Sequence, residues 1–118
     1  MAASKLPIEI EQGATFKKML TWKAGAPPVP VDLTGCKARM HVRERMDSPL
    51  PMLSLTTENS GIALGGADGT ITVRADADKT SLLSKRTGVY DLEIEFIDGT
   101  VRRLIYGPVV ISPGVTRD

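Results

Sequence analysis

Apolar and polar residues alternate with a period of two along most of the chain. The alternation is clearest in residues 36–43, where apolar side chains share one face and long basic side chains share the other. It returns in residues 90–96, where every polar position between the apolar ones is acidic. A sheet with one buried and one solvated face requires this pattern, so both segments are predicted to be strands.

Shorter segments with the same period lie between turns rich in glycine, proline, asparagine and aspartate. Asp98-Gly99 is typical of a two-residue hairpin turn, and Gly107-Pro108 is expected to break the strand that precedes it or to form a bulge in it. Turn signals predict about eight or nine short strands, which favours a β-sandwich or a small barrel. The predicted strands are residues 6–11, 15–22, 36–43, 50–55, 62–64, 70–75, 90–96, 101–106 and 109–112.

Two segments depart from this pattern. One short helix is predicted over residues 77–85, where Asp76 or Asp78 can cap the first turn. Residues 23–30 carry a glycine and several prolines, which disfavour regular structure, so this stretch is predicted to be a stiff connector. Because long helices do not alternate with the strands, the pattern predicts an all-β, antiparallel fold with the helix at one open end.

Length and composition narrow the class of protein. The 118 residues, 42% hydrophobic and 25% charged, suffice for one globular domain over residues 1–118. The net charge of +1 lacks the basic excess typical of proteins that bind nucleic acid or anionic membranes. No apolar run reaches the length of a signal peptide or a membrane span, so a soluble protein made in the cytosol is expected.

Short motifs that resemble known sites fail on their spacing. Asp76-Ala77-Asp78 resembles the start of a calcium loop, but the glycine and the distal glutamate of such a loop are missing. Residues 65–69 are rich in glycine, yet they lack the lysine of a phosphate-binding loop and precede a strand. The single cysteine, Cys36, excludes an intrachain disulfide and a multi-cysteine zinc site, and it is expected to be a small core residue.

Two charged stripes occupy predicted solvated faces. The acidic stripe consists of Asp91, Glu93 and Glu95, and the basic stripe of Lys37, Arg39, His41 and Arg43. If their strands are neighbours, the stripes pair and help to set the register, for roughly 0.2–1 kcal/mol per pair. If they are not neighbours, each stripe is a candidate docking surface. His41, the only histidine, is expected to be an ordinary surface residue.

The sequence contains no recognisable catalytic motif, so no catalytic, cofactor-binding or metal-ligating residue is predicted. A small hydrolase built from scattered carboxylates is the enzymatic alternative, and it requires two inward carboxylates with raised pKa values in a cleft. The outward alternation of the acidic stripe argues against it. Aromatic residues make up 4% of the chain and fall mostly on predicted core faces, which leaves few for stacking sugars or single-stranded nucleic acid.

A series of turn and core phrases runs from residue 8 to residue 116. It comprises Ile10-Glu11-Gln12-Gly13-Ala14-Thr15-Phe16, Leu20-Thr21-Trp22-Lys23, Val31-Asp32-Leu33-Thr34-Gly35, Ala38-Arg39-Met40, Val42-Arg43, Leu55-Thr56-Thr57-Glu58-Asn59, Gly61-Ile62, Gly69-Thr70-Ile71, Gly88-Val89-Tyr90-Asp91-Leu92-Glu93, Asp98-Gly99, Arg103-Leu104, Gly107-Pro108-Val109-Val110-Ile111-Ser112-Pro113 and Val115-Thr116. With these phrases the chain resembles a family of small proteins encoded by tailed phages and prophages of bacteria. The pattern is also similar to the N-terminal, immunoglobulin-like domain of phage baseplate upper proteins, without their long helical or fibrous extension.

The resemblance implies an immunoglobulin-like sandwich and a non-enzymatic, structural role in the virion. The chain would be a docking, adaptor or decoration module of the tail, baseplate, fibre or capsid, made in the host cytoplasm and located in the virion. Its partners would be other phage structural proteins in a homo-oligomer or symmetric assembly, with no nucleic acid, membrane, small-molecule substrate or cofactor. The alternative is a soluble, non-virion module that binds a host protein.

The candidate interface has two parts. Residues 2–11 are a candidate strand for pairing with a neighbouring protein, because main-chain bonding at a sheet edge gives affinity without special side chains. The basic stripe is the second part. The residues predicted for the interface are Leu6, Ile8, Ile10, Lys37, Arg39, His41 and Arg43.

Overall fold

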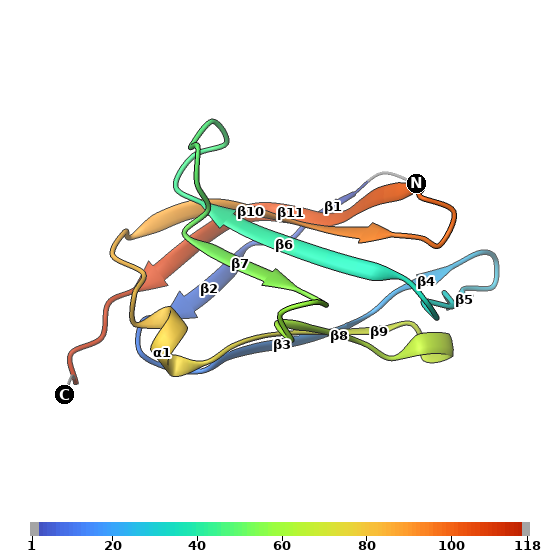
Figure 1. Cartoon of the computed structure of the whole chain (residues 1–118), viewed down its shortest axis with the longest axis horizontal. Coiled ribbons are helices and arrows are strands. Elements are labelled where there is room, and N and C mark those ends of the chain that lie inside the picture. The colour runs from blue at the N-terminus through green and yellow to red at the C-terminus, as the bar shows by residue number, and fades with distance from the viewer. Residues whose placement is uncertain (1–2, 117–118) are drawn as a thin grey trace.

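The computed structural model describes residues 3–116 and shows an all-β protein whose strands lie in two layers (Figure 1). The upper layer in that view is the larger sheet, and the lower layer is the smaller one. Within the described residues, helical structure is limited to a 3-10 turn, η1 (Gly66–Asp68), and a short helix, α1 (Ala77–Thr80). The prediction of an all-β fold is therefore confirmed.

The larger sheet is organised around its central strand, β10, which pairs antiparallel with β6 on one side and with β11 on the other. β7 lies beyond β6, and both N-terminal strands lie beyond β11. The strands of this sheet are β1 (Ser4–Lys5), β2 (Ile8–Glu11), β6 (Lys37–Arg43), β7 (Leu53–Thr56), β10 (Thr87–Glu95) and β11 (Val101–Ser112).

The smaller sheet has β9 (Thr70–Ala75) at its centre, paired antiparallel with β3 (Phe16–Thr21) and with β8 (Ile62–Leu64). Alternate residues of β9 are buried, as the period of two predicts. β3 and β8 are therefore the two edges of this sheet.

The proline-rich stretch after β3 is more regular than expected. Residues 23–30 form a small ribbon in which β4 (Lys23–Ala24) pairs with β5 (Val29–Pro30). The prediction of a stiff connector without regular structure is wrong, because a proline without an N–H is tolerated in a ribbon that has no further strand to bond.

The core lies between the two sheets, where apolar side chains from both layers form one cluster. In β6 and β10, buried inward positions alternate with outward positions, most of which are charged. This period of two places apolar side chains in the core and charged side chains in solvent. The buried hydrophobic residues are Ile8, Ile10, Leu33, Ala38, Met40, Val42, Leu53, Leu55, Ile62, Ile71, Val73, Ala75, Leu83, Tyr90, Leu92, Ile94, Val109 and Ile111.

The N-terminal strands pair within the domain. β1 and β2 both run parallel to β11, so this edge departs from the predicted antiparallel arrangement, which holds for the other pairings of described strands. Pro7 separates the two strands, and the chain is fixed next to it by the Tyr90 hydroxyl, which donates to the Leu6 carbonyl oxygen at 2.6 Å. Burial raises the pKa of Tyr90 to about 12, so the hydroxyl keeps the proton that this bond needs.

The C-terminal strand is continuous from Val101 to Ser112 and keeps its register with β10 at Gly107 and Pro108, so the predicted break or bulge there is wrong. Gly107 instead allows a close approach of two strands, since a Cβ there would lie 2.8 Å from the Leu6 carbonyl oxygen. Pro108 points to the exposed side of the sheet. The irregularity of this strand lies elsewhere: the pairing with β10 shifts by one residue beside Leu92.

The helix α1 is shorter than the predicted span of residues 77–85 and ends at Thr80. Thr80 is fully buried, and its hydroxyl donates to the Ala14 carbonyl oxygen and accepts the Gly13 N–H, which anchors this turn to the start of β3. Asp76 occupies the N-cap position but makes no capping bond with its side chain. Its carboxylate instead accepts a bond from Arg74 at 3.0 Å, so the predicted capping role is wrong for Asp76.

Candidate functional site

The two charged stripes lie next to each other on the outer face of the larger sheet. Strands β6 and β10 are neighbours, and their register places Lys37 opposite Glu95, Arg39 opposite Glu93, and His41 opposite Asp91. The prediction of neighbouring strands with opposite charges in register is therefore confirmed, and among the described residues the ion pairs between the stripes all come from Arg39. A face that pairs its own charges presents both signs to a partner rather than one.

Arg39 joins the stripes through one guanidinium that contacts two carboxylates. Its Nε donates to Glu93 Oε1 at 2.9 Å, and its Nη1 donates to Glu95 Oε1 at 3.2 Å. The bonds to Glu95 and then Glu93 raise the pKa of Arg39 above its usual value. These side chains are 33–39% exposed, so water screens the pairs, which contribute roughly 0–1 kcal/mol each.

Asp91 lies in the middle of the same face, opposite His41. Burial is the main cause that raises the pKa of its carboxyl above the usual value, and the neighbouring charge of Glu93 adds to it. The neighbouring side chains of Arg103, His41 and Arg43 act in the opposite direction without cancelling the rise. Ionised Asp91 is thus held at a cost, which a donor from a docked protein would reduce.

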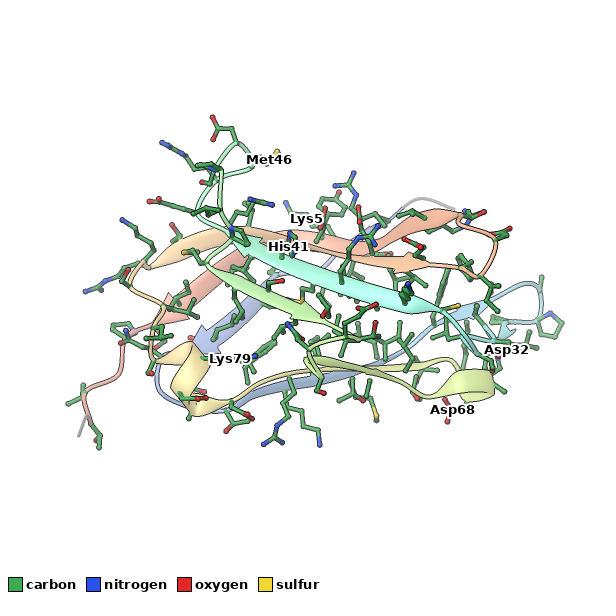
Figure 2. All side chains as sticks on the ribbon, viewed as in Figure 1. Lys5, Asp32, His41, Met46, Asp68 and Lys79 are labelled. Carbon is green, nitrogen blue, oxygen red and sulfur yellow. The ribbon has the colours of Figure 1, made fainter. Side chains whose placement is uncertain are left out.

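A loop between β6 and β7 rises beside this face (Figure 2). Arg43 fixes it from below, because its Nη1 donates to the Ser48 carbonyl oxygen at 2.9 Å. The Arg45 N–H donates to Ser48 Oγ at 3.0 Å and tightens the turn. Met46 stands in the loop with 83% of its surface exposed. The following strand begins at Leu53 rather than at residue 50, so the loop is longer than predicted.

A hollow of about 560 Å³ lies between the loop and the far strand β11. It combines an exposed methionine, a tyrosine and several arginines with the carboxylates of β10, and Arg103 lies over the Tyr106 ring at 5.2 Å from its centre. The residues that line it are Lys5, Arg39, His41, Arg43, Met46, Val89, Tyr90, Asp91, Glu93, Arg103, Tyr106, Gly107 and Pro108.

The predicted interface residues divide into two groups. Arg39, His41 and Arg43 line the hollow. Lys37, the first residue of β6, is exposed and is not among the residues that line it. The side chains of the N-terminal group point away from solvent: Ile8 and Ile10 are buried in the core, and Leu6 is half-buried. The structure therefore brings the basic stripe together on one face and separates it from the N-terminal group, whose main chain bonds to β11.

Several residues of the hollow were not predicted from the sequence. Met46 carried a detectable signal, because an isolated methionine in a polar loop is a large apolar side chain with no strand to bury it. Arg103 carried none, since its side of the sheet depends on the register shift between β10 and β11. Tyr106 lies on the same side of this shift as Val109, so alternation from Val109 places it on the outer face. Lys5 enters only because β1 folds back along β11.

Other chemistry singled out in the sequence is not gathered into a site. Among residues 3–116, no group of three or more histidine, cysteine or acidic side chains is placed to hold a metal ion. Cys36 is half-buried against the core, and burial, with a smaller contribution from Asp32, raises the pKa of its thiol. No helix in the described part of the chain has the length and apolar character needed to cross a bilayer.

Comparisons with known proteins assign no family to the chain. A scan against protein-family models gave no match to the chain, and a search of curated proteins gave none either.

Proposed function

We propose that the chain is a non-enzymatic docking module of a phage virion, built as an immunoglobulin-like β-sandwich. The strand order supports the fold assignment. One layer runs β7-β6-β10-β11 and the other β8-β9-β3, which is the order expected when an immunoglobulin-like domain carries an added strand beside the third. The single cysteine means that this version of the fold lacks the disulfide that joins the sheets in antibody domains.

The observation that carries the docking function is the hollow on the outer face of the larger sheet. Methionine, tyrosine and arginine are enriched in the centres of protein interfaces, and Met46, Tyr106 and Arg103 meet there. The exposed methionine offers an apolar anchor with an adaptable shape. The charges around it are already partly paired, so a partner is selected by complementary charges of both signs.

The virion setting is supported by the resemblance of the sequence phrases to small proteins of tailed phages. A module of this size, which presents one rigid sheet face and balanced charge, suits repeated docking in a symmetric particle. Its partners are then other structural proteins of the tail, baseplate, fibre or capsid, and further copies of the chain. The module is made in the host cytoplasm and ends in the particle.

Quantitative mass spectrometry of purified particles from the source tests this function. We expect the chain at a fixed molar ratio to the major tail or capsid protein, and that ratio gives the symmetry of the ring or fibre it joins. Abundance in the infected-cell lysate with none in the particles contradicts the virion function and favours the host-directed module instead.

A matched pair of variants tests the face itself. Met46→Asp places a charge on the proposed anchor, and Leu82→Asp makes the same change at an equally exposed position next to α1. Because both side chains are more than 80% exposed, neither variant is expected to change folding appreciably. We expect Met46→Asp to be lost from particles and Leu82→Asp to be retained; equal incorporation of the two excludes this face as the docking site.

A further inference from the structure

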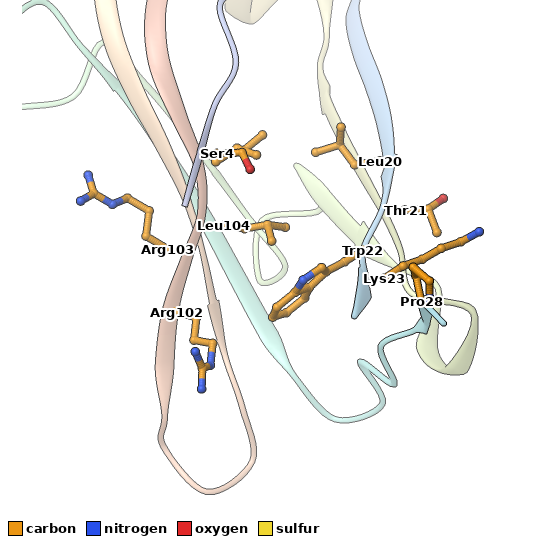
Figure 3. Close-up of a pocket in the computed structure, with 10 residues that line it drawn as sticks. Ser4, Leu20, Thr21, Trp22, Lys23, Pro28, Arg102, Arg103 and Leu104 are labelled. Carbon is orange, nitrogen blue, oxygen red and sulfur yellow. The ribbon is translucent and has the colours of Figure 1, made fainter. Parts of the chain in front are cut away.

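A second surface lies along one side of the molecule, where an edge of the smaller sheet stays apart from the larger sheet. β3 is an edge of the smaller sheet, and among the described strands it pairs only with β9. It faces β1 and β11 of the larger sheet across a groove of about 470 Å³ (Figure 3). The groove is lined by Ser4, Leu20, Thr21, Trp22, Lys23, Pro28, Arg102, Arg103, Leu104 and Ile105.

The floor of the groove is apolar and incompletely covered. Leu20 and Trp22 project from the β3 side toward β11, and Leu104 projects back toward them (Figure 3). Together with Ile105 they pack against the core, yet each stays only partly buried. The Trp22 ring also packs on Phe96, with 5.9 Å between ring centres. An extended segment with one apolar side chain would bury this surface, which folding alone leaves in contact with water.

The backbone around Trp22 is held rigidly. Its N–H donates to the Gly69 carbonyl oxygen, and its own carbonyl accepts the Val31 N–H, each at 2.9 Å. Gly69 permits this approach, since a Cβ at that position would lie 2.7 Å from the Trp22 carbonyl oxygen. A groove wall fixed in this way loses little conformational entropy when it binds a partner.

The Trp22 indole also has an unmet hydrogen bond. Its Nε1 is buried and has no acceptor among the described residues. Buried donors without a partner are rare because each costs about 1–3 kcal/mol.

A register shift supplies the charge in the groove. Leu92 pairs with Ile105 but Glu93 pairs with Arg103, so Leu104 is an extra residue on β11. Beyond it, Arg102 lies opposite the buried Ile94 and therefore on the inward side of the sheet. Within residues 3–116 Arg102 forms no ion pair, and the charged residues that line the groove are all basic.

We propose that this groove docks an extended, acidic segment of a partner protein along the open edge of β3. An apolar side chain of the segment enters between Trp22 and Leu104, and a carboxylate pairs with Arg102. Complementary charge selects this occupant over a basic one, and main-chain bonding to β3 requires an extended conformation. The inference goes beyond the outer-face function and does not depend on the virion setting.

The only tryptophan of the chain lies in this groove, so its fluorescence reports binding there directly. The probes are three synthetic peptides: alternating Val-Glu, alternating Val-Lys, and the Val-Glu peptide with alternate backbone amides methylated. We expect saturable binding of the Val-Glu peptide, with a change in the Trp22 fluorescence and in the indole N–H signal in NMR spectra. Binding of the other two is expected to be about tenfold weaker or absent.

Charge reversal provides the decisive variant. Arg102→Glu changes an exposed side chain, and Arg86→Glu makes the same change at an exposed position near the opposite end of the sheet. We expect Arg102→Glu to prefer the Val-Lys peptide and Arg86→Glu to behave as the native chain. Unchanged preference in Arg102→Glu, or no saturable binding of the Val-Glu peptide to the native chain, overturns the proposal.

Two further measurements distinguish peptide binding in the groove from self-association of the chain and from docking at the outer face. A Trp22 signal that changes with protein concentration alone means that a second copy covers the groove, which also overturns the acidic-segment proposal. Met46→Asp serves as the control for the outer face. It is expected to leave peptide binding unchanged, so failure at the groove and failure at the outer face give different results.

Discussion

The two sides on which the sheets approach each other differ in how completely the chain closes them. On the closed side, β7 leads into β8 through the turn of residues 57–61, which joins the larger sheet to the smaller one. On the open side, β3 faces β1 and β11 across the groove that contains Trp22. Leu53, Leu55 and Ile62 on the closed side are buried, whereas Leu20, Trp22 and Leu104 on the open side are only partly covered.

Turn chemistry explains the difference. On the closed side the Asn59 side chain accepts the N–H groups of Thr56 and Gly61 and donates to the Ser54 carbonyl oxygen, each at 2.9 Å. One asparagine thus holds the turn that joins the two sheets. No comparable side chain spans the groove among residues 3–116, where Arg102 is a cation without a carboxylate. A chain that closes one side with specific bonds and leaves the other apolar and basic keeps that second side for a partner.

The largest expected effect comes from removing a leucine on each side. Leu55→Ala on the closed side empties a fully buried position and should lower the free energy of unfolding by about 2–5 kcal/mol. Leu104→Ala on the open side should cost about 1 kcal/mol, because its side chain already contacts water and no enclosed cavity forms. Urea unfolding followed by Trp22 fluorescence or circular dichroism measures both. Equal losses would mean that the open side is closed in solution.

A smaller loss is expected from Gly61→Ala. The added Cβ would lie 2.9 Å from Leu55 Cα and 2.8 Å from Asn59 Oδ1, so a backbone segment or the turn must move. We expect a loss of about 1–3 kcal/mol in the free energy of unfolding, as for other overpacked positions. Thermal unfolding measures it. A neutral result would show that the closed side is loosely packed and would weaken the contrast with the groove.

The smallest effects come from two carboxylates with opposite shifts. The pKa of Asp91 is raised, chiefly by burial, so its ionisation opposes folding as the pH rises through its folded-state value. The pKa of Asp98 is lowered, chiefly because its carboxylate accepts the Thr100 N–H, so its contribution to stability is present above the unfolded-state value and is lost as the pH falls through the folded-state value.

Substitution by asparagine should therefore act in opposite directions. At neutral pH, Asp91→Asn should gain stability and Asp98→Asn should lose it, and both differences should shrink as the pH falls and the native carboxyls become protonated. Unfolding curves across the acidic range measure the two differences. The same sign for both variants would contradict the assigned causes of the two pKa shifts.

The period of two predicted most of the fold because it needs only local information. Residues 36–43 and 90–96 became neighbouring strands with the apolar side inward and the charges outward, and opposite charges matched their register. The strand of residues 70–75 has the predicted bounds for the same reason. The parallel pairing of β1 and β2 could not be predicted in this way, because nothing local in residues 4–11 specifies that they pair with β11.

The groove could not be predicted from the alternation either, for a physical reason. Alternation assigns each residue to a face, but a single extra residue reverses every assignment beyond it. The shift beside Leu92 does this to Arg102, which alternation from Val109 and Ile111 would have placed outward. Trp22 packs against the core, as was expected for most aromatic residues, yet only the separation of β3 from β11 leaves it at the surface of a groove.

Native-state hydrogen exchange of the isolated chain tests the contrast between the two sides most directly. If one side is open, the amides of Phe16–Thr21 that point away from β9 exchange rapidly, whereas those of β6 and β10 exchange only through global unfolding. Addition of the Val-Glu peptide should then slow the β3 amides selectively. Protection of the outward β3 amides as strong as that of β6, without any peptide, would contradict the account.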